Sequence, residues 1–231
     1  MMNADISSRV AFRACRSYDA RLPTALDELL ADLGGWERFV RRGTHVLVKP
    51  NLLADEPPEK AVTTHPALLS AVVRRLRAAG AAVIVGDSPA SAVRIADVWE
   101  RTGTAAVCAA LDVPLVSFEK RGAREVVRDG LVFGVARDAL EAELIVSLPK
   151  VKTHNLTLLT AGVKNLFGTL PGYQKTQRHK EFPHPVAFGR YLRALVKVLP
   201  PVLSIADGVV GMHGDGPSGG DPVALGFLAA A

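Results

Sequence analysis

The sequence predicts an α/β fold in which a mainly parallel, mixed sheet carries helices on both faces and a β-hairpin is inserted. Short β-branched runs alternate with Ala-, Leu- and Arg-rich stretches, and this order is typical of parallel strands joined by right-handed helical crossovers. The chain has 231 residues, of which 48% are hydrophobic and 22% charged, so it can bury a sizeable core. We therefore expect a single α/β domain over residues 1–231.

The individual elements follow from hydrophobic periodicity and turn residues. Four β-branched runs are expected to be strands, namely Val46–Val48, Ala82–Val85, Leu115–Phe118 and Leu144–Leu148. Helices are expected between them, over Pro66–Ala79 and Ile95–Ala110; the first has Pro66 in its first turn and one apolar stripe. Glu125–Arg128 and Leu131–Ala136 flank Asp129-Gly130 and predict a hairpin at an antiparallel sheet edge.

The last third of the chain has a different character. We expect helices over Thr157–Asn165 and Val186–Val198 and a last core strand over Val202–Ala206, followed by a Gly-rich loop. The run Val223–Ala231 is apolar and has no capping polar residue. We therefore expect the domain to be C-terminally shortened, with imperfect docking of this run and a mobile Asp207–Gly220 loop.

Composition excludes several classes of protein. No stretch approaches the roughly 18 to 20 uncharged apolar residues of a membrane span, and the N-terminal residues have no apolar signal-peptide segment. We expect a cytoplasmic protein without a membrane partner. The only cysteines, Cys15 and Cys108, are expected to be buried apolar side chains, which excludes a disulfide framework and a four-cysteine iron–sulfur cluster bound by this chain alone.

Charge is distributed unevenly along the chain. Residues 1–149 contain 19 basic and 19 acidic side chains, whereas residues 150–200 contain nine Lys or Arg against Glu181 alone, and residues 201–231 contain three Asp and no Lys or Arg. This asymmetry predicts an anionic partner for the first of these regions and a cation for the second. Residues 150–220 are therefore expected to be the basic and Gly-rich functional segment.

Polar side chains follow three of the expected strands. Lys49 and Asn51 follow the first, Asp87 and Ser88 the second, and Lys150 the last. Ligands of open parallel sheets bind beyond the carboxyl ends of strands, so we expect Asn51, Asp87 and Lys150 to lie together in a ligand-binding site. The alternative for each residue alone is ordinary turn chemistry.

The segment from residue 150 to residue 165 carries the most concentrated signal. Lys150, Lys152 and His154 alternate, so an extended backbone places their side chains on one side, where the N-terminus of the following helix would favour an anion. Lys164 and Asn165 lie at the far end of that helix and are further candidate ligand-binding residues. The alternative for Lys164 is a cation that complements the helix dipole.

Three histidines of this region have open roles. Neighbouring lysines lower the pKa of His154, which makes it a candidate general base, with Lys152 as the second candidate catalytic residue. The alternative for His154 is a structural hydrogen bond. His179 and His184 lie in an expected loop, either as a lid over the anion or as solvent-exposed side chains.

Asp207 and Asp215 are the candidate metal ligands. Both lie in a Gly-rich passage, and a divalent cation such as Mg²⁺ takes carboxylate oxygens and commonly bridges to phosphate. The spacing is neither that of an EF-hand nor that of a P-loop. Asp207 is alternatively the cap of a turn.

Six blocks of the sequence together resemble the bacterial and archaeal domain-of-unknown-function family 362: VKPNLL, TTHPALLSAVVRRL, VGDSP, LPKVKTH, TAGVKNLFG and IADGVVGMHGDGPSGG. The resemblance implies an α/β fold and redox chemistry, because family members are often fused to a ferredoxin-like iron–sulfur module. That module is absent here, so the implied redox partner is a separate ferredoxin-like protein. The polar positions that the resemblance implies are Lys49, Asn51, Asp87, Lys150, Lys152, His154, Lys164, Asn165, Asp207 and the 214–220 loop.

The leading hypothesis is a protein that binds a small anionic metabolite or a phosphorylated cofactor, as a metal-assisted or redox-linked enzyme. The alternative is a non-catalytic anion-binding or nucleic-acid-binding module. Nucleic-acid binding requires basic residues spread over a surface with aromatic stacking platforms. The basic excess lies here in one segment with few aromatic residues near its lysines, so we favour the small molecule.

Overall fold

The computed structural model describes residues 9–90 and 93–231. The strands of this part are β1 (Ala11–Ala14), β2 (His45–Pro50), β3 (Ala82–Asp87), β4 (Leu115–Ser117), β5 (Ala123–Arg128), β6 (Leu131–Ala136), β7 (Leu144–Leu148), β8 (Lys150–His154), β9 (Leu158–Thr160), β10 (Val202–His213) and β11 (Asp221–Ala230). The α-helices are α1 (Leu22–Ala31), α2 (Pro66–Ala78), α3 (Ile95–Arg101), α4 (Thr104–Ala110), α5 (Phe118–Arg121), α6 (Arg137–Glu141), α7 (Gly162–Asn165), α8 (Gln174–Glu181) and α9 (Pro185–Val196). Short 3₁₀ helices are η1 (Trp36–Arg38), η2 (Pro58–Lys60) and η3 (Leu166–Thr169).

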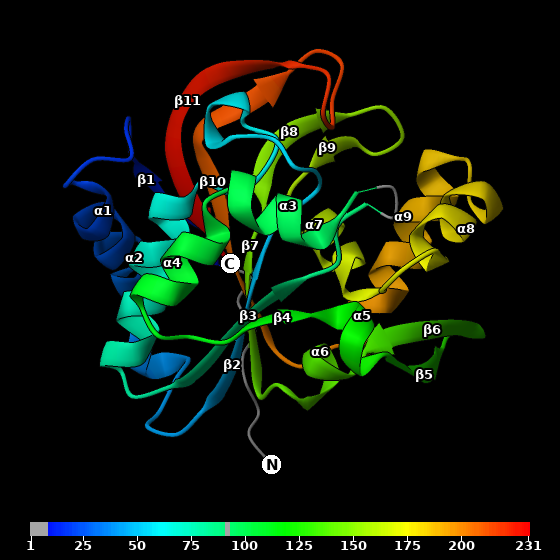
Figure 1. The fold of residues 1–231 in the computed structure, drawn as a ribbon, viewed down its shortest axis with the longest axis horizontal. Helices are drawn as coiled ribbons and strands as arrows, with labels where there is room; N and C mark the ends of the chain where they lie inside the picture. The colour runs from blue at the N-terminus through cyan, green and yellow to red at the C-terminus, as the bar shows by residue number, and fades with distance from the viewer. Residues whose placement is uncertain (1–8, 91–92) are drawn as a thin grey trace.

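A mixed sheet forms the centre of the molecule (Figure 1). Its strand order in the described residues is β1-β11-β10-β7-β2-β3-β4, and β8 pairs with β10 and carries β9. The strands from β10 to β4 are parallel to one another, whereas β11 runs antiparallel to both β10 and β1. The predicted fold class, an α/β fold with a mainly parallel mixed sheet, is confirmed.

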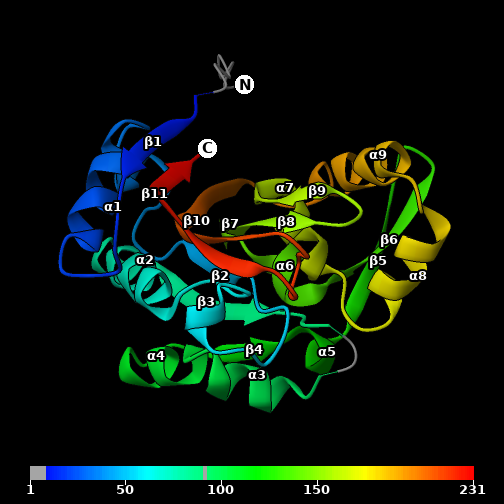
Figure 2. The same cartoon turned by 90° about the horizontal axis from the view of Figure 1, so that it is seen from above.

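Helices cover both faces of the sheet, as predicted. Both faces of β2 are apolar, because successive side chains of a strand point to opposite faces. Val46 and Val48 belong to one buried apolar cluster, and Leu47 belongs to the other. The first cluster packs α1, α2 and α4 on the sheet, and the second packs α6, α9 and the hairpin of β5 and β6. Figure 2 shows α1 and α2 on one side of the strands and α8 and α9 on the other.

The helices are short. The longest in the described residues is α2, with 13 residues, and its cap is formed by Nδ1 of His65, which accepts the backbone N–H of Ala67. Within the described part of the chain, no helix has both the length and the apolar character that are needed to cross a membrane.

Most elements of the first two thirds lie where the sequence predicts them. The four predicted strands are β2, β3, β4 and β7, and the helix predicted from Pro66 is α2. The helix predicted over Ile95–Ala110 is broken at Gly103, whose φ of 73° ends α3 and begins α4. The hairpin is confirmed, but it forms a separate two-stranded sheet and not an edge of the main sheet.

The helix predicted over Thr157–Asn165 is wrong. The chain instead turns back after β8 into β9, so that Lys152 lies opposite Thr160 and His154 lies opposite Leu158. Only the last four residues of the predicted range are helical, as α7. Pairing with β8, which no local pattern encodes, outweighs the helical propensity of this Leu- and Thr-rich stretch.

The prediction of a poorly docked C-terminal run is also wrong. β11 hydrogen bonds to β1 on one side and to β10 on the other, and Leu228 and Ala230 are buried. The range expected to be a mobile loop contains Asp207–His213, which is the second half of β10. A Gly-rich segment becomes a central strand here because β11 and β8 pair with it on both sides.

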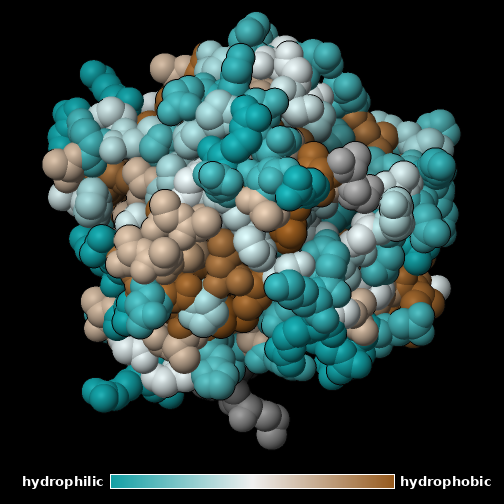
Figure 3. Space-filling model, viewed as in Figure 1, coloured by the Kyte–Doolittle hydropathy of each residue, from teal (hydrophilic) through white to brown (hydrophobic). Residues whose placement is uncertain are grey.

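Apolar side chains gather at the centre of the face drawn in Figure 3, over α4, β3 and β4. β4 has three residues and is the last strand of the sheet order in the described residues, so this short edge offers few free backbone groups for further pairing.

Candidate functional site

A cavity of about 420 Å³ lies at the carboxyl ends of β2 and β3. Its walls come from the ends of these two strands, from β8 and β9, from α7 and η3, from α8, and from Pro217 in the turn between β10 and β11. The position is the one where ligands bind in open parallel sheets. Segments that are far apart in the sequence therefore enclose one space.

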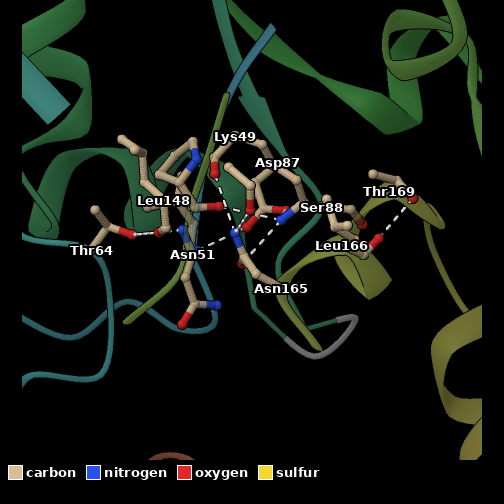
Figure 4. Close-up of polar contacts among 12 residues, drawn as sticks. Lys49, Asn51, Thr64, Asp87, Ser88, Leu148, Asn165, Leu166 and Thr169 are labelled. Carbon is tan, nitrogen blue, oxygen red and sulfur yellow. Dashed lines mark hydrogen bonds and ion pairs between the residues drawn. The ribbon is translucent and has the colours of Figure 1, made fainter. Parts of the chain in front are cut away.

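A buried ion pair forms the floor of the cavity (Figure 4). Nζ of Lys49 lies 2.7 Å from Oδ1 of Asp87, and both side chains are almost fully buried. Nζ also donates to Oδ1 of Asn165 at 3.2 Å, while Nδ2 of Asn165 donates to Oγ of Ser147 at 2.9 Å. The second carboxylate oxygen of Asp87 accepts the backbone N–H of Leu52 at 2.8 Å. These contacts occupy Lys49, Asp87 and Asn165 and hold β2, β3 and α7 together.

Gly168 is required by this ion pair. A Cβ atom at that position would lie 2.7 Å from Nζ of Lys49 and closer still to Oδ1 of Asp87. No side chain other than hydrogen fits, so η3 packs its backbone directly on the ion pair.

A second polar group forms the wall near α8. Nζ of Lys175 donates to the carbonyl oxygen and to Oγ of Ser88, and Oγ of Ser88 donates to Glu119. Burial opposes ionisation of Glu119, but hydrogen bonds from Ser88 and Ser117 outweigh it and lower the pKa of this carboxyl. Burial lowers the pKa of Lys175 to about 8, against the opposing charges of Asp87 and Glu119.

Two further lysines, Lys152 and Lys164, line the cavity but differ from Lys49 in their contacts. Lys152 is 2% exposed, and its Nζ donates to the carbonyl oxygen of Val62 at 2.6 Å. Nζ of Lys164 lies over the ring of Phe167, 4.7 Å from its centroid. Within residues 9–90 and 93–231, neither amine forms an ion pair with a carboxylate. The cavity thus holds two lysines whose charge the described residues do not compensate.

The environment makes both amines less basic than ordinary lysines. Burial, followed by the charges of Lys164 and Lys150, lowers the pKa of Lys152 to about 7, against the opposing charge of Asp87. Burial, followed by the charges of Lys49 and Lys175, lowers the pKa of Lys164 to about 8. Lysines with a pKa near neutrality gather at functional sites more often than elsewhere.

His154 lies beside Lys152 on the same face of β8 and also lines the cavity. Its Nδ1 accepts the backbone N–H groups of Leu156 at 3.0 Å and of Thr157 at 3.4 Å. Burial, followed by the charges of Lys164, His179 and Lys152, lowers the pKa of His154 to about 4. In this arrangement the neutral ring carries its proton on Nε2 and is a hydrogen-bond donor towards the cavity, whereas the predicted role of general base requires the other tautomer.

Asn51 is the remaining predicted ligand-binding residue of the cavity wall. Its backbone N–H donates to Oγ1 of Thr64 at 2.7 Å, which fixes the turn after β2. Its side chain extends away from the ion pair of Lys49 and Asp87 (Figure 4), and in the described part of the chain its buried Oδ1 has no hydrogen-bond donor. An acceptor left in this state costs free energy until a donor reaches it.

Lys150 does not line the cavity, although it lies at the same edge of the sheet as Asn51 and Asp87. Its Nζ lies 2.7 Å from Oδ2 of Asp207 and donates to the hydroxyl of Tyr18 at 3.0 Å, and that hydroxyl donates to Oδ1 of Asp207 at 2.6 Å. The prediction that Lys150, Lys152 and His154 converge at a helix N-terminus is therefore wrong. A buried carboxylate on the neighbouring strand attracts Lys150, and the segment after β8 is a strand and not a helix.

The predicted metal ligands do not form a common site. Asp207 is fully buried and accepts hydrogen bonds from Tyr18, from Lys150 and from the backbone of His65. Asp215 is exposed in the turn after β10, and the second half of that strand, Asp207–His213, separates it from Asp207. The described residues contain no group of three or more His, Cys, Asp or Glu side chains that could hold a metal ion.

Sequence reasoning missed Lys175 and Glu119 as residues of the site and left His179 between two interpretations. His179 lines the cavity from α8, and its ring packs edge-on against Phe167 at 5.1 Å. Lys175 belongs to the basic excess of residues 150–200, so charge alone could have indicated it. Glu119 carries no signal of that kind, because the residues before 150 are neutral overall. The two cysteines are buried and free, as predicted.

The fold and the lysine-lined cavity define an α/β protein whose site lies at the carboxyl ends of parallel strands. Residues 46–231 match a family described as "Domain of unknown function (DUF362)", and the chain belongs to this family. A relative from Synechocystis sp. (strain ATCC 27184 / PCC 6803 / Kazusa), named thylakoid-associated protein sll1697, is 39% identical over 228 residues. The alignment covers 96% of this chain and 69% of that protein.

Two solved structures resemble the fold. The lactate racemase apoprotein from Thermoanaerobacterium thermosaccharolyticum matches with a TM-score of 0.56 at 14% sequence identity, over 95% of this chain and 53% of that one. A Thermotoga maritima protein of known crystal structure matches with a TM-score of 0.49 at 14% identity, over 90% of this chain and 54% of that one. The chain thus spans about half the length of these structures, and the racemase shares its fold.

Proposed function

We propose that the cavity binds a small organic anion, a carboxylate or a phosphate, through Lys152 and Lys164. The observation that carries this proposal is the enclosure of these two amines in one cavity without a carboxylate partner in the described residues. Lys175 and the Nε2–H of His154 supply further donors on the same walls. The proposed partner is a small molecule and not a nucleic acid, and the proposed compartment is the cytoplasm.

Electrostatics supports an anion as the ligand. Burial lowers the pKa of Lys152 and of Lys164, and neighbouring ammonium groups lower it further, so the surroundings of both amines disfavour their charged forms. An anion placed beside the amines compensates positive charge and accepts charge-assisted hydrogen bonds. The volume of about 420 Å³ lies in the range of small-molecule sites, about 300 to 1,000 Å³.

Thermal unfolding at increasing concentrations of two probes, propionate and inorganic phosphate, tests the proposal. A ligand that binds only the folded state raises the melting temperature with its concentration. We expect at least one probe to do so, and we expect Lys164→Met to weaken that probe's affinity by about tenfold or more, which is about 1.4 kcal/mol. The two probes distinguish a carboxylate site from a phosphate site.

Lys180→Met is the matched control, because Lys180 is an exposed lysine of α8. It removes the same charge without touching the cavity, so the response to the probe is expected to stay as in the wild type. A response that equals that of sodium chloride at the same ionic strength, or that survives Lys164→Met unchanged, contradicts the proposal.

A further inference from the structure

Lys152 differs from the other lysines of the cavity in how its amine is held. Lys49 and Lys175 contact oxygens of Asp87 and Ser88, whereas among the described residues Nζ of Lys152 has one acceptor, the carbonyl oxygen of Val62 at 2.6 Å. One N–H bond directed at this oxygen fixes the position of the nitrogen. In the neutral amine the lone pair then points away from the carbonyl, and the side chain lines the cavity.

Lys164 supplies a second amine, which remains mostly charged at pH 7 because its pKa is lowered only to about 8. Its Nζ lies 4.7 Å from the ring centroid of Phe167 and 5.7 Å from that of Phe188, and aromatic faces attract cations. The strand pair of β8 and β9 and the helix α7 thus hold a fixed cation and a buried amine on the walls of the same cavity. A lysine in an apolar pocket beside another cation is the arrangement that activates an amine as a nucleophile.

We infer that Lys152 is a nucleophile that captures the carbonyl group of a small oxo acid as an imine. This inference rests on the proposed anion site, because Lys164 and Lys175 would hold the carboxylate of the same molecule. The substrate class is therefore an anion with an aldehyde or ketone carbon close to its charged group. Pyruvate is the smallest stable member of that class that carries a ketone.

Imine formation requires only the amine of Lys152 and the carbonyl group of the substrate, and it releases one water molecule. Nζ of neutral Lys152 attacks the carbonyl carbon, and a C–N bond forms as the carbonyl π bond breaks. One amine proton moves to the oxygen to give a carbinolamine, and the second leaves with that hydroxyl as water, so that a C=N bond replaces the C=O bond. The Nε2–H of His154, two residues along β8, donates a hydrogen bond to the oxygen as its negative charge develops.

The protonation state of Lys152 fits this role. Burial, followed by the charges of Lys164 and Lys150, lowers its pKa to about 7, and the charge of Asp87 opposes them. The neutral fraction therefore rises through about pH 7, whereas an exposed lysine becomes neutral only near pH 10. Capture by Lys152 is expected to reach its plateau well below the pH at which surface lysines react.

Reductive trapping tests the inference. The protein is incubated with pyruvate and sodium cyanoborohydride, which reduces an imine to a stable secondary amine, and the modified peptide is identified by mass spectrometry. We expect one adduct per chain, on Lys152, whose yield rises through about pH 7. Lys152→Arg keeps a cation but no nucleophile, so it should lose the adduct. Lys180→Met should leave the adduct unchanged.

Lys164→Met tests whether the charge of Lys164 activates the amine of Lys152. Removing this neighbouring charge raises the pKa of Lys152, so the pH of half-maximal trapping should move upward even where some adduct still forms. Propionate has the carboxylate without the carbonyl, so it should compete with pyruvate and slow trapping.

Adducts spread over exposed lysines, an adduct that survives Lys152→Arg, or a pH profile unchanged by Lys164→Met would overturn the inference. A rise in melting temperature with pyruvate and propionate, but without any adduct, overturns the imine and leaves the proposed anion site standing. If pyruvate, propionate and inorganic phosphate all leave the melting temperature unchanged and no adduct forms, the anion site itself fails. Thermal unfolding of each variant without ligand shows that it is folded.

Discussion

Single residues decide how the ion pair of Lys49 and Asp87 is buried. Asn165 accepts a hydrogen bond from Lys49, and Gly168 lets the backbone of η3 approach both charges. Burial of such a pair is tolerated only when its remaining hydrogen-bonding groups are satisfied, and any displacement exposes one charge without its partner. Gly168 therefore acts through packing, and its requirement is steric, since its backbone has no positive φ.

Gly168→Ala is expected to lower the free energy of unfolding by about 1 to 3 kcal/mol, because the added methyl group overpacks the ion pair. Gly189→Ala is the matched control: Gly189 is inside α9, and apart from its chain neighbours and the backbone of its own helix no described heavy atom lies within 4 Å of a Cβ built there. Alanine in place of a helical glycine should raise the stability by up to about 1 kcal/mol. Urea unfolding measures both values, and equal effects of the two substitutions would show that η3 does not press on the ion pair.

At the scale of elements, β11 and β8 determine where the site lies. β10 pairs with β7 at its start and with β8 farther along, and a register irregularity between Asp207 and Met212 separates the side chains of Lys150 and Lys152. The first lysine reaches Asp207, and the second reaches the cavity. β11 supports β10 from the other side and thus belongs to the framework of the site.

Leu228→Ala tests whether β11 is docked. The side chain is fully buried in the first apolar cluster, so its truncation should lower the free energy of unfolding by about 2 to 5 kcal/mol. Leu225→Ala in the same strand serves as control, because Leu225 is 40% exposed and should cost less than about 1.5 kcal/mol. Chemical unfolding compares them, and a cost for Leu228→Ala no greater than that of the control would mean that β11 frays in solution.

For the whole molecule, four of the nine Lys and Arg side chains of residues 150–200 lie in the interior or on the walls of the cavity. Lys150 and Lys152 are buried, and Lys164 and Lys175 line the cavity. The exposed basic residues of this segment include Arg190 and Arg193 on α9, while Lys197 forms an ion pair with Asp129. Part of the charge that makes the sequence basic is therefore not available to a surface that could follow a polyanion.

We therefore expect weak binding of nucleic acid. Fluorescence anisotropy with a labelled single-stranded oligonucleotide in 0.15 M salt should give a dissociation constant above about 100 µM, the weak end of non-specific binding. Micromolar binding that weakens steeply as salt rises would favour a nucleic-acid-binding module. Lys164→Met provides the comparison, because it should weaken binding of the small anion by about tenfold or more without affecting the oligonucleotide.

Short sequence patterns predicted three strands of the sheet, one helix and the hairpin. The β-branched runs of β2, β3 and β7, the proline and apolar stripe of α2, and the Asp-Gly turn of the hairpin each carry their signal within a few residues. The same strands place Lys49, Asn51 and Asp87 at one edge, because parallel neighbours end together. This part of the site follows from sequence because strand order and strand polarity are enough to predict it.

Tertiary structure decided the rest. The partner of each lysine depends on strands paired across long separations: Lys150 finds Asp207 because β8 lies beside β10, and Lys152 is left without a carboxylate in the described residues. β9 and β11 are strands because other strands offer them backbone hydrogen bonds. By itself, the sequence determined the α/β class, the strands of the parallel centre and the basic segment. Which amines are paired and which face the cavity depended on non-local pairing and burial, which no short pattern of residues encodes.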